Sequence, residues 1–166
     1  MSYVQSFPPI ESATSRVLIL GTMPGIVSLR ERQYYAHPQN AFWRIAGTIV
    51  GFDSASPYEV RVDLMRAAGI AIWDVLKSCT RQSSLDSDIV HSTAVANDLP
   101  AFLGAHPQIR RVCFNGAKAE TLYARHVRPH LEGRQDIHYV RLPSTSPANA
   151  SVPWPAKLQA WQAALL

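Results

Sequence analysis

The run Arg16-Val-Leu-Ile-Leu20 leads directly into Gly21-Thr-Met-Pro-Gly25, and this stretch decides the fold. A short apolar run that ends in a Gly/Pro turn predicts a buried strand. Three later runs share this character: Ile70–Trp73, Arg111–Phe114 and Ile137–Leu142. Helical patterns separate the runs, at Phe42–Val50, Pro57–Ala68, Val95–Leu103, Ala117–His126 and Pro155–Leu165. Strands that alternate with helices predict a three-layer α/β/α domain around a central four-stranded parallel sheet, and the length of 166 residues fits one domain over 1–166.

The helix at Pro57–Ala68 carries the clearest boundary signals. Ser56 is a favourable N-cap, Pro57 suits the first helical position, and Glu59 completes a capping box. Gly69 then predicts the end of the helix. The pattern over Val95–Leu103 is weaker because Pro100 interrupts it.

Charge and cysteine content limit the possible partners and cofactors. The net charge is +4 and the pI is about 9.3, which mildly favours an anionic partner. Arginine outnumbers lysine, and the planar guanidinium group of arginine suits phosphate. A GC-rich genome, which favours arginine codons, explains the excess of arginine equally well. Cys79 and Cys113 fall at or near apolar runs, so we expect buried free thiols and neither a four-cysteine zinc site nor an iron–sulfur cluster.

Met1–Pro9 lacks the features of a signal peptide and no apolar stretch could cross a membrane, which predicts a cytoplasmic protein.

Polar or Gly/Pro-rich segments follow all four predicted strands. They are Gly21–Gly25, Asp74–Cys79, Asn115-Gly116 and Pro143–Asn149. Because ligands bind beyond the carboxyl ends of strands in open α/β sheets, we expect these segments to meet at one rim. Taken singly, each is more typical of an ordinary turn than of a binding site.

The stretch Gln33-Tyr-Tyr-Ala-His-Pro-Gln-Asn-Ala-Phe-Trp43 holds four aromatic residues, a histidine and an asparagine. Rings for stacking and an amide for edge contacts indicate a pocket for a flat ligand that forms hydrogen bonds. His37 precedes a proline and is read as a structural or phosphate-facing residue. The other histidines are spaced unlike any metal site, so no metal is predicted.

The combination of motifs resembles the uracil-DNA glycosylase superfamily, and within it the hypoxanthine (deoxyinosine) DNA glycosylase branch. The resemblance covers most of the chain and is carried by Gly21-Thr-Met-Pro-Gly25, Ser28-Leu29, Tyr34-Tyr-Ala-His-Pro38, Asn40-Ala-Phe-Trp43, Gly69-Ile-Ala-Ile-Trp-Asp-Val75, Ser84-Leu-Asp86, Phe114-Asn-Gly116 and Leu142-Pro-Ser-Thr-Ser-Pro147. It implies a four-stranded parallel sheet between helices and an enzyme that flips a damaged base out of duplex DNA and hydrolyses its N-glycosidic bond.

Two departures from the superfamily pattern shift the expected catalyst. Met23 stands where many members carry an acidic or amide residue that activates water, and Ser144 stands where uracil-specific members carry a histidine. The resemblance instead implies Asn40, which matches the asparagine that positions water in the hypoxanthine branch. Asn40 is also well suited to cap the helix that follows, and the two roles are compatible.

The resemblance also assigns base and DNA contacts. Asp74 falls at the base-reading position, where a carboxylate accepts from N–H groups and a protonated acid can donate, although capping or pairing with arginine is an alternative. Phe42 would stack on the flipped base unless it is a core residue, while Tyr34, Tyr35 and Trp43 would form the pocket wall or the core. The expected contacts are Gly21, Met23 and Gly25 with the base, and Ser28, Ser144, Ser146 and Asn149 with DNA. Ala148 and Asn149 lie at the superfamily's wedge position, and Ala148 is small for that task.

The sequence thus predicts a monomeric, monofunctional DNA glycosylase with no metal or organic cofactor, acting on double-stranded DNA that carries a deaminated base, hypoxanthine first. Water would be the nucleophile, because none of the three lysines (Lys77, Lys118, Lys157) matches a catalytic position. The alternatives are a uracil or mismatch-specific uracil DNA glycosylase and a non-catalytic module that binds damaged DNA or a nucleotide.

Overall fold

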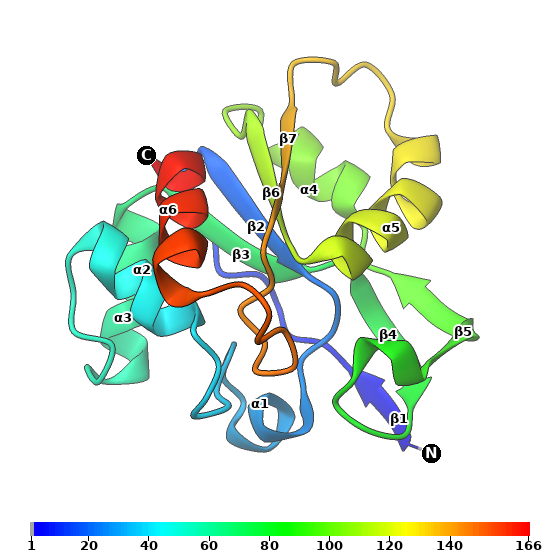
Figure 1. The fold of residues 1–166 in the computed structure, drawn as a ribbon. Helices are drawn as coiled ribbons and strands as arrows, with labels where there is room; N and C mark the ends of the chain where they lie inside the picture. The colour runs from blue at the N-terminus through cyan, green and yellow to red at the C-terminus, as the bar shows by residue number, and fades with distance from the viewer. Residues whose placement is uncertain (1) are drawn as a thin grey trace.

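The computed structural model describes residues 2–166 and has a four-stranded parallel sheet at its centre (Figure 1). Its strands lie in the order β3-β2-β6-β7, and every neighbouring pair is parallel. The bounds are β2 Val17–Gly21, β3 Ile70–Asp74, β6 Arg111–Asn115 and β7 His138–Leu142. The predicted α/β class and the four predicted strands are confirmed, with boundaries shifted by one residue at one or both ends.

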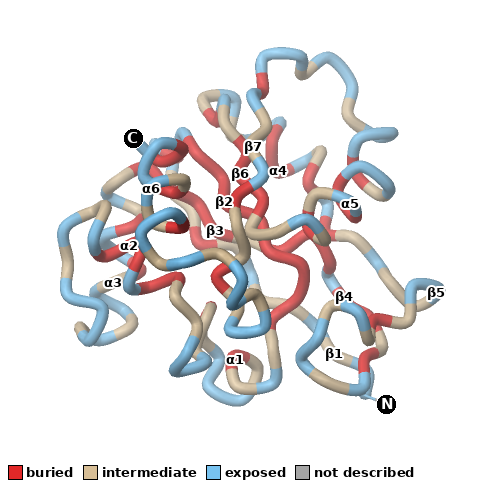
Figure 2. Tube along the Cα trace, in the orientation of Figure 1, coloured by how far each residue is buried: buried red, intermediate tan, exposed pale blue. Residues whose placement is uncertain are grey.

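Helices cover both faces of this sheet. On one face α2 (Phe42–Val50), α3 (Tyr58–Ala67) and α6 (Trp154–Leu165) pack against one apolar cluster, and on the other face α4 (Leu99–Ala105) and α5 (Ala117–His126) pack against a second. All five residues of β2 are buried, and Figure 2 shows the burial concentrated along the central strands. Because helices cover both faces of the sheet, side chains on both sides of β2 are buried, and apolar residues do not alternate with polar ones. This explains the continuous apolar run Val-Leu-Ile-Leu.

The register of the sheet aligns the residues that matter for a site. Gly21 at the end of β2 pairs with Asp74 at the end of β3, and Asn115 at the end of β6 pairs with Leu142 at the end of β7. The carboxyl ends of all four strands therefore lie along one edge, as expected for a ligand-binding α/β sheet.

A second sheet was not predicted from the sequence. Strands β1 (Ser2–Gln5), β4 (Leu76–Arg81) and β5 (Ile89–Ala96) form an antiparallel sheet in the order β1-β4-β5. The segment Asp74–Cys79, expected to be a polar loop, therefore mostly belongs to β4. Register shifts between β4 and β5 disturb the alternation of buried and exposed side chains that would have marked these strands.

The predicted start of α4 and the predicted capping box of α3 are wrong. Val95 and Ala96 belong to β5, and α4 begins only after Asp98, whose carboxylate accepts a hydrogen bond from the Ala101 amide (3.1 Å). At α3 the N-cap is Pro57, with no side-chain cap, so the capping box at Ser56 does not form. The Ser56 carbonyl accepts instead from Arg61 Nε (2.9 Å).

Short helical turns complete the chain. They are α1 (Ile26–Glu31), η1 (Asp86–Asp88) and η2 (Arg128–His130). Both cysteines are buried free thiols, as predicted, and burial raises the pKa of Cys113 to about 11. Within residues 2–166, no helix has the length and apolar character needed to cross a membrane.

Candidate active site

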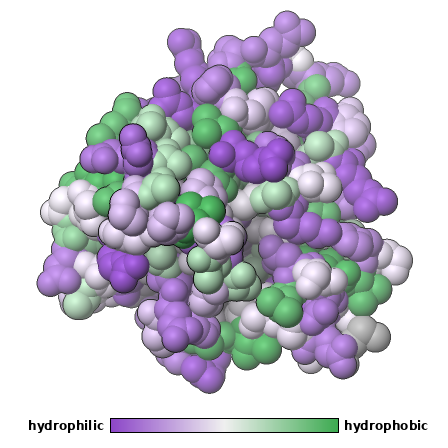
Figure 3. Space-filling view, in the orientation of Figure 1, coloured by the Kyte–Doolittle hydropathy of each residue, from purple (hydrophilic) through white to green (hydrophobic). Residues whose placement is uncertain are grey.

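A pocket of about 430 Å³ opens at the carboxyl edge of the parallel sheet. In Figure 1, α1, the loop after β7 and the β4–β5 hairpin surround this edge, and Figure 3 shows the same face hollowed near its centre. The segments after all four strands contribute to the wall, which confirms that they share one rim. The lining residues are Gly21, Thr22, Met23, Gly25–Ser28, Tyr35, His37, Asn40, Asp74, Ser84–Asp86, Asn115 and Ser144–Asn149.

The Gly21–Gly25 loop brings its backbone close to two pocket side chains. A Cβ atom added at Gly21 would lie 2.6 Å from Asp74 Oδ1 and 3.0 Å from the Tyr35 hydroxyl oxygen, so any larger residue would force these two side chains to shift. The buried guanidinium of Arg81 donates from Nη2 to the Pro24 carbonyl oxygen (2.6 Å) and fixes the loop from beneath. Gly21, Met23 and Gly25 all reach the pocket wall, where the sequence placed them.

Asp74 forms part of the buried pocket wall, with a relative exposure of 3%. Asn97 Nδ2 holds the surrounding backbone by donating to the carbonyl oxygens of Asp74 (2.8 Å) and Leu76 (3.1 Å). Burial and the negative charge of Asp86 raise the pKa of the Asp74 carboxyl to about 8, while Arg81 acts in the opposite direction. The side chain is therefore largely a neutral acid near pH 7.

Asn40 lies on the pocket wall immediately before α2. Its Oδ1 accepts a hydrogen bond from the amide of Phe42, the first residue of α2 (2.9 Å). The N-cap of α2 is Ala41, however, and not Asn40 as predicted. The next amide, that of Ala41, donates to the Thr145 carbonyl oxygen (3.0 Å), and this bond ties Asn40 to the loop after β7. A carbonyl oxygen has two lone pairs, so Asn40 can bond to the Phe42 amide and still accept from a water in the pocket.

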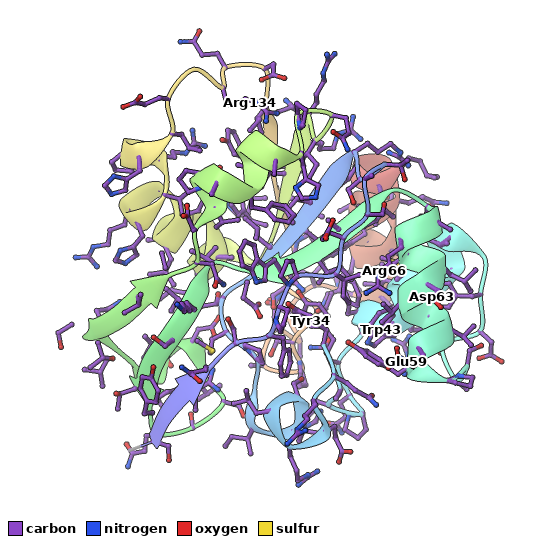
Figure 4. All side chains as sticks on the ribbon, turned by 180° about the vertical axis from the view of Figure 1, so that it is seen from behind. Tyr34, Trp43, Glu59, Asp63, Arg66 and Arg134 are labelled. Atoms are coloured by element: carbon purple, nitrogen blue, oxygen red, sulfur yellow. The ribbon has the colours of Figure 1, made fainter. Side chains whose placement is uncertain are left out.

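The aromatic ring that lines the pocket is Tyr35. Phe42 is 1% exposed and stacks behind Tyr35, with ring centroids 4.1 Å apart. The predicted stacking of Phe42 on a base therefore has no support in this arrangement, because Tyr35 stands between. Tyr34 and Trp43 are buried core residues and neither lines this pocket. Trp43 Nε1 donates to the Tyr34 carbonyl oxygen (2.7 Å), and Figure 4 shows Trp43 beside α3. Tyr35 has a φ of 54°, a strained conformation of the kind found at functional sites.

The predicted DNA-contact residues divide into two groups. The hydroxyls of Ser144 and Ser146 accept from the amides of Ser146 (3.1 Å) and Ala148 (3.2 Å), and Asn149 Nδ2 donates to the Ser144 carbonyl oxygen (3.3 Å). These bonds shape the loop after β7, yet each hydroxyl keeps its own O–H to donate. Ser28 is buried and its hydroxyl accepts from the Ala36 amide (3.0 Å), so its contact with DNA stays a prediction.

Three buried polar atoms on the pocket wall have no hydrogen-bond partner among residues 2–166. They are Thr22 Oγ1, Tyr35 Oη and Asp74 Oδ2. Buried polar groups are nearly always paired, so three orphans in one cavity indicate a place for a polar ligand or for water. No group of three or more His, Cys, Asp or Glu residues in the described chain could hold a metal ion.

Sequence reasoning missed several residues that shape this site. Arg81, Asp86, Asn97 and Thr145 lie beside or beneath the pocket through contacts between distant segments, which a local pattern does not reveal. Of these, Asp86 and Thr145 lie within motifs that carried the family resemblance, Ser84-Leu-Asp86 and Leu142–Pro147, but neither was named as a site residue.

Asn115 links the ends of β6 and β7. Its Oδ1 accepts from the Thr145 amide (2.9 Å) and its Nδ2 donates to the Thr145 hydroxyl (3.0 Å). Since each such bond contributes about 1 kcal/mol, Asn115→Ala is expected to lower the free energy of unfolding by about 1–3 kcal/mol and to loosen the bond between the Ala41 amide and Thr145. Urea unfolding would measure the change, with Gln39→Ala, an exposed amide, as the control. Equal stability of the two variants would contradict this role.

Comparison with known proteins gives a consistent result. Residues 8–165 match the Uracil DNA glycosylase superfamily. A protein named hypoxanthine DNA glycosylase from Methanosarcina barkeri is 37% identical over 120 residues, covering 69% of this chain and 72% of its own length. A second protein of that name, from Methanosarcina acetivorans, is 35% identical over 116 residues with the same coverage.

A solved structure agrees along nearly the whole chain. The solution NMR structure of a candidate uracil DNA glycosylase from Methanosarcina acetivorans superimposes with a TM-score of 0.82 at 31% identity, covering 99% of this chain and 97% of the other. The fold, the pocket at the carboxyl edge of the sheet and the sequence match all point the same way, and the chain belongs to the uracil DNA glycosylase superfamily.

Proposed function

We propose that this protein is a monofunctional DNA glycosylase that removes hypoxanthine from double-stranded DNA by hydrolysing its N-glycosidic bond. The observation that carries the proposal is the single pocket wall that joins Asn40, Tyr35 and Asp74 in a cavity of about 430 Å³. This volume falls in the range of small-molecule sites, and a flipped base is such a ligand. The two relatives named hypoxanthine DNA glycosylase support the choice of base.

Each lining group suits one part of this reaction. Asn40 would hold the attacking water through its side-chain oxygen, Tyr35 would stack on the flipped base, and Asp74 would contact the edge of that base. Ser144, Ser146 and Asn149, on the loop after β7, would contact the DNA backbone. The protein would act as a single domain and a monomer.

Water, rather than an amine, is the proposed nucleophile. None of the three lysines lies on the pocket wall. Lys157 is buried and donates from Nζ to the Asn149 carbonyl oxygen (3.1 Å), which supports the loop after β7 but does not reach a sugar. Among residues 2–166, therefore, no amine in this pocket is a candidate for a Schiff base with the abasic sugar.

A cleavage assay tests the proposed function. Duplexes that carry deoxyinosine, deoxyuridine or deoxyxanthosine would be incubated with the protein and treated with alkali, which breaks the strand at abasic sites. We expect breakage on the deoxyinosine duplex first. Absence of strand breaks on all three would refute glycosylase activity, and a preference for deoxyuridine would replace hypoxanthine by uracil as the substrate base.

Replacing Tyr35 tests which ring stacks on the base. Stacking of an aromatic side chain on a base is worth about 1–3 kcal/mol, so Tyr35→Ala is expected to weaken the apparent affinity for deoxyinosine duplex by about 5- to 150-fold. Tyr35→Phe keeps the ring and serves as the matched control, with affinity close to that of the wild type. Unchanged affinity in Tyr35→Ala would show that a residue other than Tyr35 stacks on the base.

A further inference from the structure

The carboxyl group of Asp74 lies in surroundings that suit a neutral acid better than an anion. It is 3% exposed, its Oδ2 has no hydrogen-bond partner, and it forms no ion pair among residues 2–166. An unpaired buried carboxylate is strongly unfavourable, while a protonated carboxyl needs only a few hydrogen-bond partners. The space beside it is preserved by Gly21, since any Cβ there would contact Asp74 Oδ1.

The charged and titratable groups around Asp74 come from several elements. Asp86, from η1, lines the same pocket, and its own pKa is raised by burial. Arg81, from β4, is the nearby cation, but it directs Nη2 to the Pro24 carbonyl oxygen. The other titratable groups are Tyr34, Tyr35 and His37, of which His37 lines the same pocket. Burial raises the pKa of both phenols far above neutral, so neither phenol supplies a charge near pH 7. The net effect favours the protonated form of Asp74, with a pKa of about 8.

We propose that Asp74 enters the reaction as a neutral carboxylic acid and gives its proton to N7 of the departing purine, and that Asp86 is the positioning residue that keeps it protonated. This inference rests on the proposed function and deepens it. A purine such as hypoxanthine presents N7 and O6 as acceptors on one edge, whereas uracil has no N7. An acid at this place would therefore favour a purine leaving group, in a chain where Met23 and Ser144 replace the polar groups expected for uracil.

The bond changes balance without any further reactant. The C1′–N9 bond breaks and its electron pair moves to N9, while the Asp74 O–H bond breaks and its proton moves to N7, so hypoxanthine leaves as a neutral base. The oxygen of the water held by Asn40 bonds to C1′ and its surplus proton passes to solvent. Asp74 then regains a proton from solvent. Proton donation to a leaving group typically contributes a factor of about 10²–10⁴ in rate.

Single-turnover excision from a deoxyinosine duplex between pH 5 and pH 10 tests this role. For the wild type we expect the rate to fall at alkaline pH, as Asp74 loses its proton. Asp74→Asn keeps the shape and can donate a hydrogen bond but not a proton, so its rate should drop about 100-fold and lose the alkaline decline. In Asp86→Asn the alkaline decline should move to lower pH, because the charge that favours the neutral acid is gone. A wild-type rate in Asp74→Asn, or an unmoved decline in Asp86→Asn, would overturn the proposal.

A second measurement reads the protonation state without activity. The pKa of Asp74 is higher in the folded state than the usual value of an unfolded carboxyl, so its contribution to stability is full at acidic pH and is lost as the pH rises to about 8. The amide introduced by Asp74→Asn does not titrate. The Tm of this variant minus that of the wild type should therefore increase from pH 5 to pH 8. A constant difference would show that Asp74 is already ionised at pH 5.

The substrate panel separates this proposal from the proposed function. If the wild type breaks none of the base-modified duplexes, the glycosylase assignment fails, whatever the Tm measurements give. If the wild type excises hypoxanthine but also removes 7-deazahypoxanthine, which lacks N7, at the same rate, the glycosylase assignment stands and proton donation to N7 is refuted.

Discussion

Asn40→Ala is expected to reduce excision of hypoxanthine by about 1,000-fold while leaving affinity for the deoxyinosine duplex nearly unchanged. Loss of one well-placed polar group that acts on the transition state costs about 10²–10³ in rate, and here no other described pocket residue has a comparable position before α2. The expected retention of binding follows because the proposed stacking ring, Tyr35, and the loop after β7 remain. Single-turnover rates and fluorescence anisotropy with labelled duplex would measure the two quantities separately.

The hydrogen bond between Asn40 and the start of α2 requires its own control. Because Oδ1 accepts from the Phe42 amide, Asn40→Ala should also lower the free energy of unfolding by about 0.5–1.5 kcal/mol. Asn40→Ser keeps a side-chain oxygen for this bond but is too short to hold a water at the same point, so it should be as stable as the wild type and still inactive. Full turnover in Asn40→Ser would limit Asn40 to this structural bond and place the water elsewhere.

The central sheet was predictable because each of its strands lies between two layers of helices. Val17–Gly21 shows this directly: five consecutive buried residues leave a continuous apolar signal in the sequence. The β1-β4-β5 sheet gave no such signal, since β4 mixes exposed Lys77 with buried Ser78 and Arg81 and its pairing with β5 is irregular. Its other neighbour, β1, comes from the far end of the chain, so the pairing depends on tertiary contacts that no local pattern contains.

The pocket was predictable at the level of loops but not of individual side chains. The rule that strand ends converge placed Gly21, Asp74 and Ser144 together, and the structure does bring them to one wall. The choice between Tyr35 and Phe42 depended on backbone direction: the left-handed φ of Tyr35 turns its ring to the pocket, and the start of α2 turns Phe42 into the core. The sequence alone does not show which of two aromatic residues in one short stretch faces the pocket and which faces the core.

The burial of Arg81 shows a second limit. Arginine is ordinarily an exposed residue, so nothing in the sequence indicated a guanidinium beneath the first loop. In the structure it is 2% exposed, bonds to the Pro24 carbonyl oxygen, and leaves Nε and Nη1 without partners among residues 2–166. Its charge lowers the pKa of Asp74 and Asp86, opposing the effect of burial on both carboxyls. The protonation state of the pocket thus depends on a residue that sequence reasoning did not consider.

Gly21→Ala is expected to reduce excision by more than about 100-fold in a protein that still folds. The added methyl group would lie 2.6 Å from Asp74 Oδ1 and 3.0 Å from the Tyr35 hydroxyl, both closer than van der Waals contact allows, so both side chains must move. A displacement of about 1 Å in a positioning group can cost about 10²-fold in rate, and this change displaces two of them. Overpacking should lower the free energy of unfolding by about 1–3 kcal/mol, which circular dichroism and urea unfolding would follow.

Gly104→Ala is the matched control for this variant. Gly104 lies in α4, and a Cβ there would meet nothing within 4 Å, so the same chemical change should leave excision unaltered and stabilise the helix by about 0.5–1 kcal/mol. If Gly21→Ala excised hypoxanthine at the rate of Gly104→Ala, the close spacing of β2, Asp74 and Tyr35 would not matter for the reaction. A large loss in Gly21→Ala alone would locate the base-contacting wall at the carboxyl end of β2, since Gly21 pairs with Asp74 across the sheet and no other change has been made.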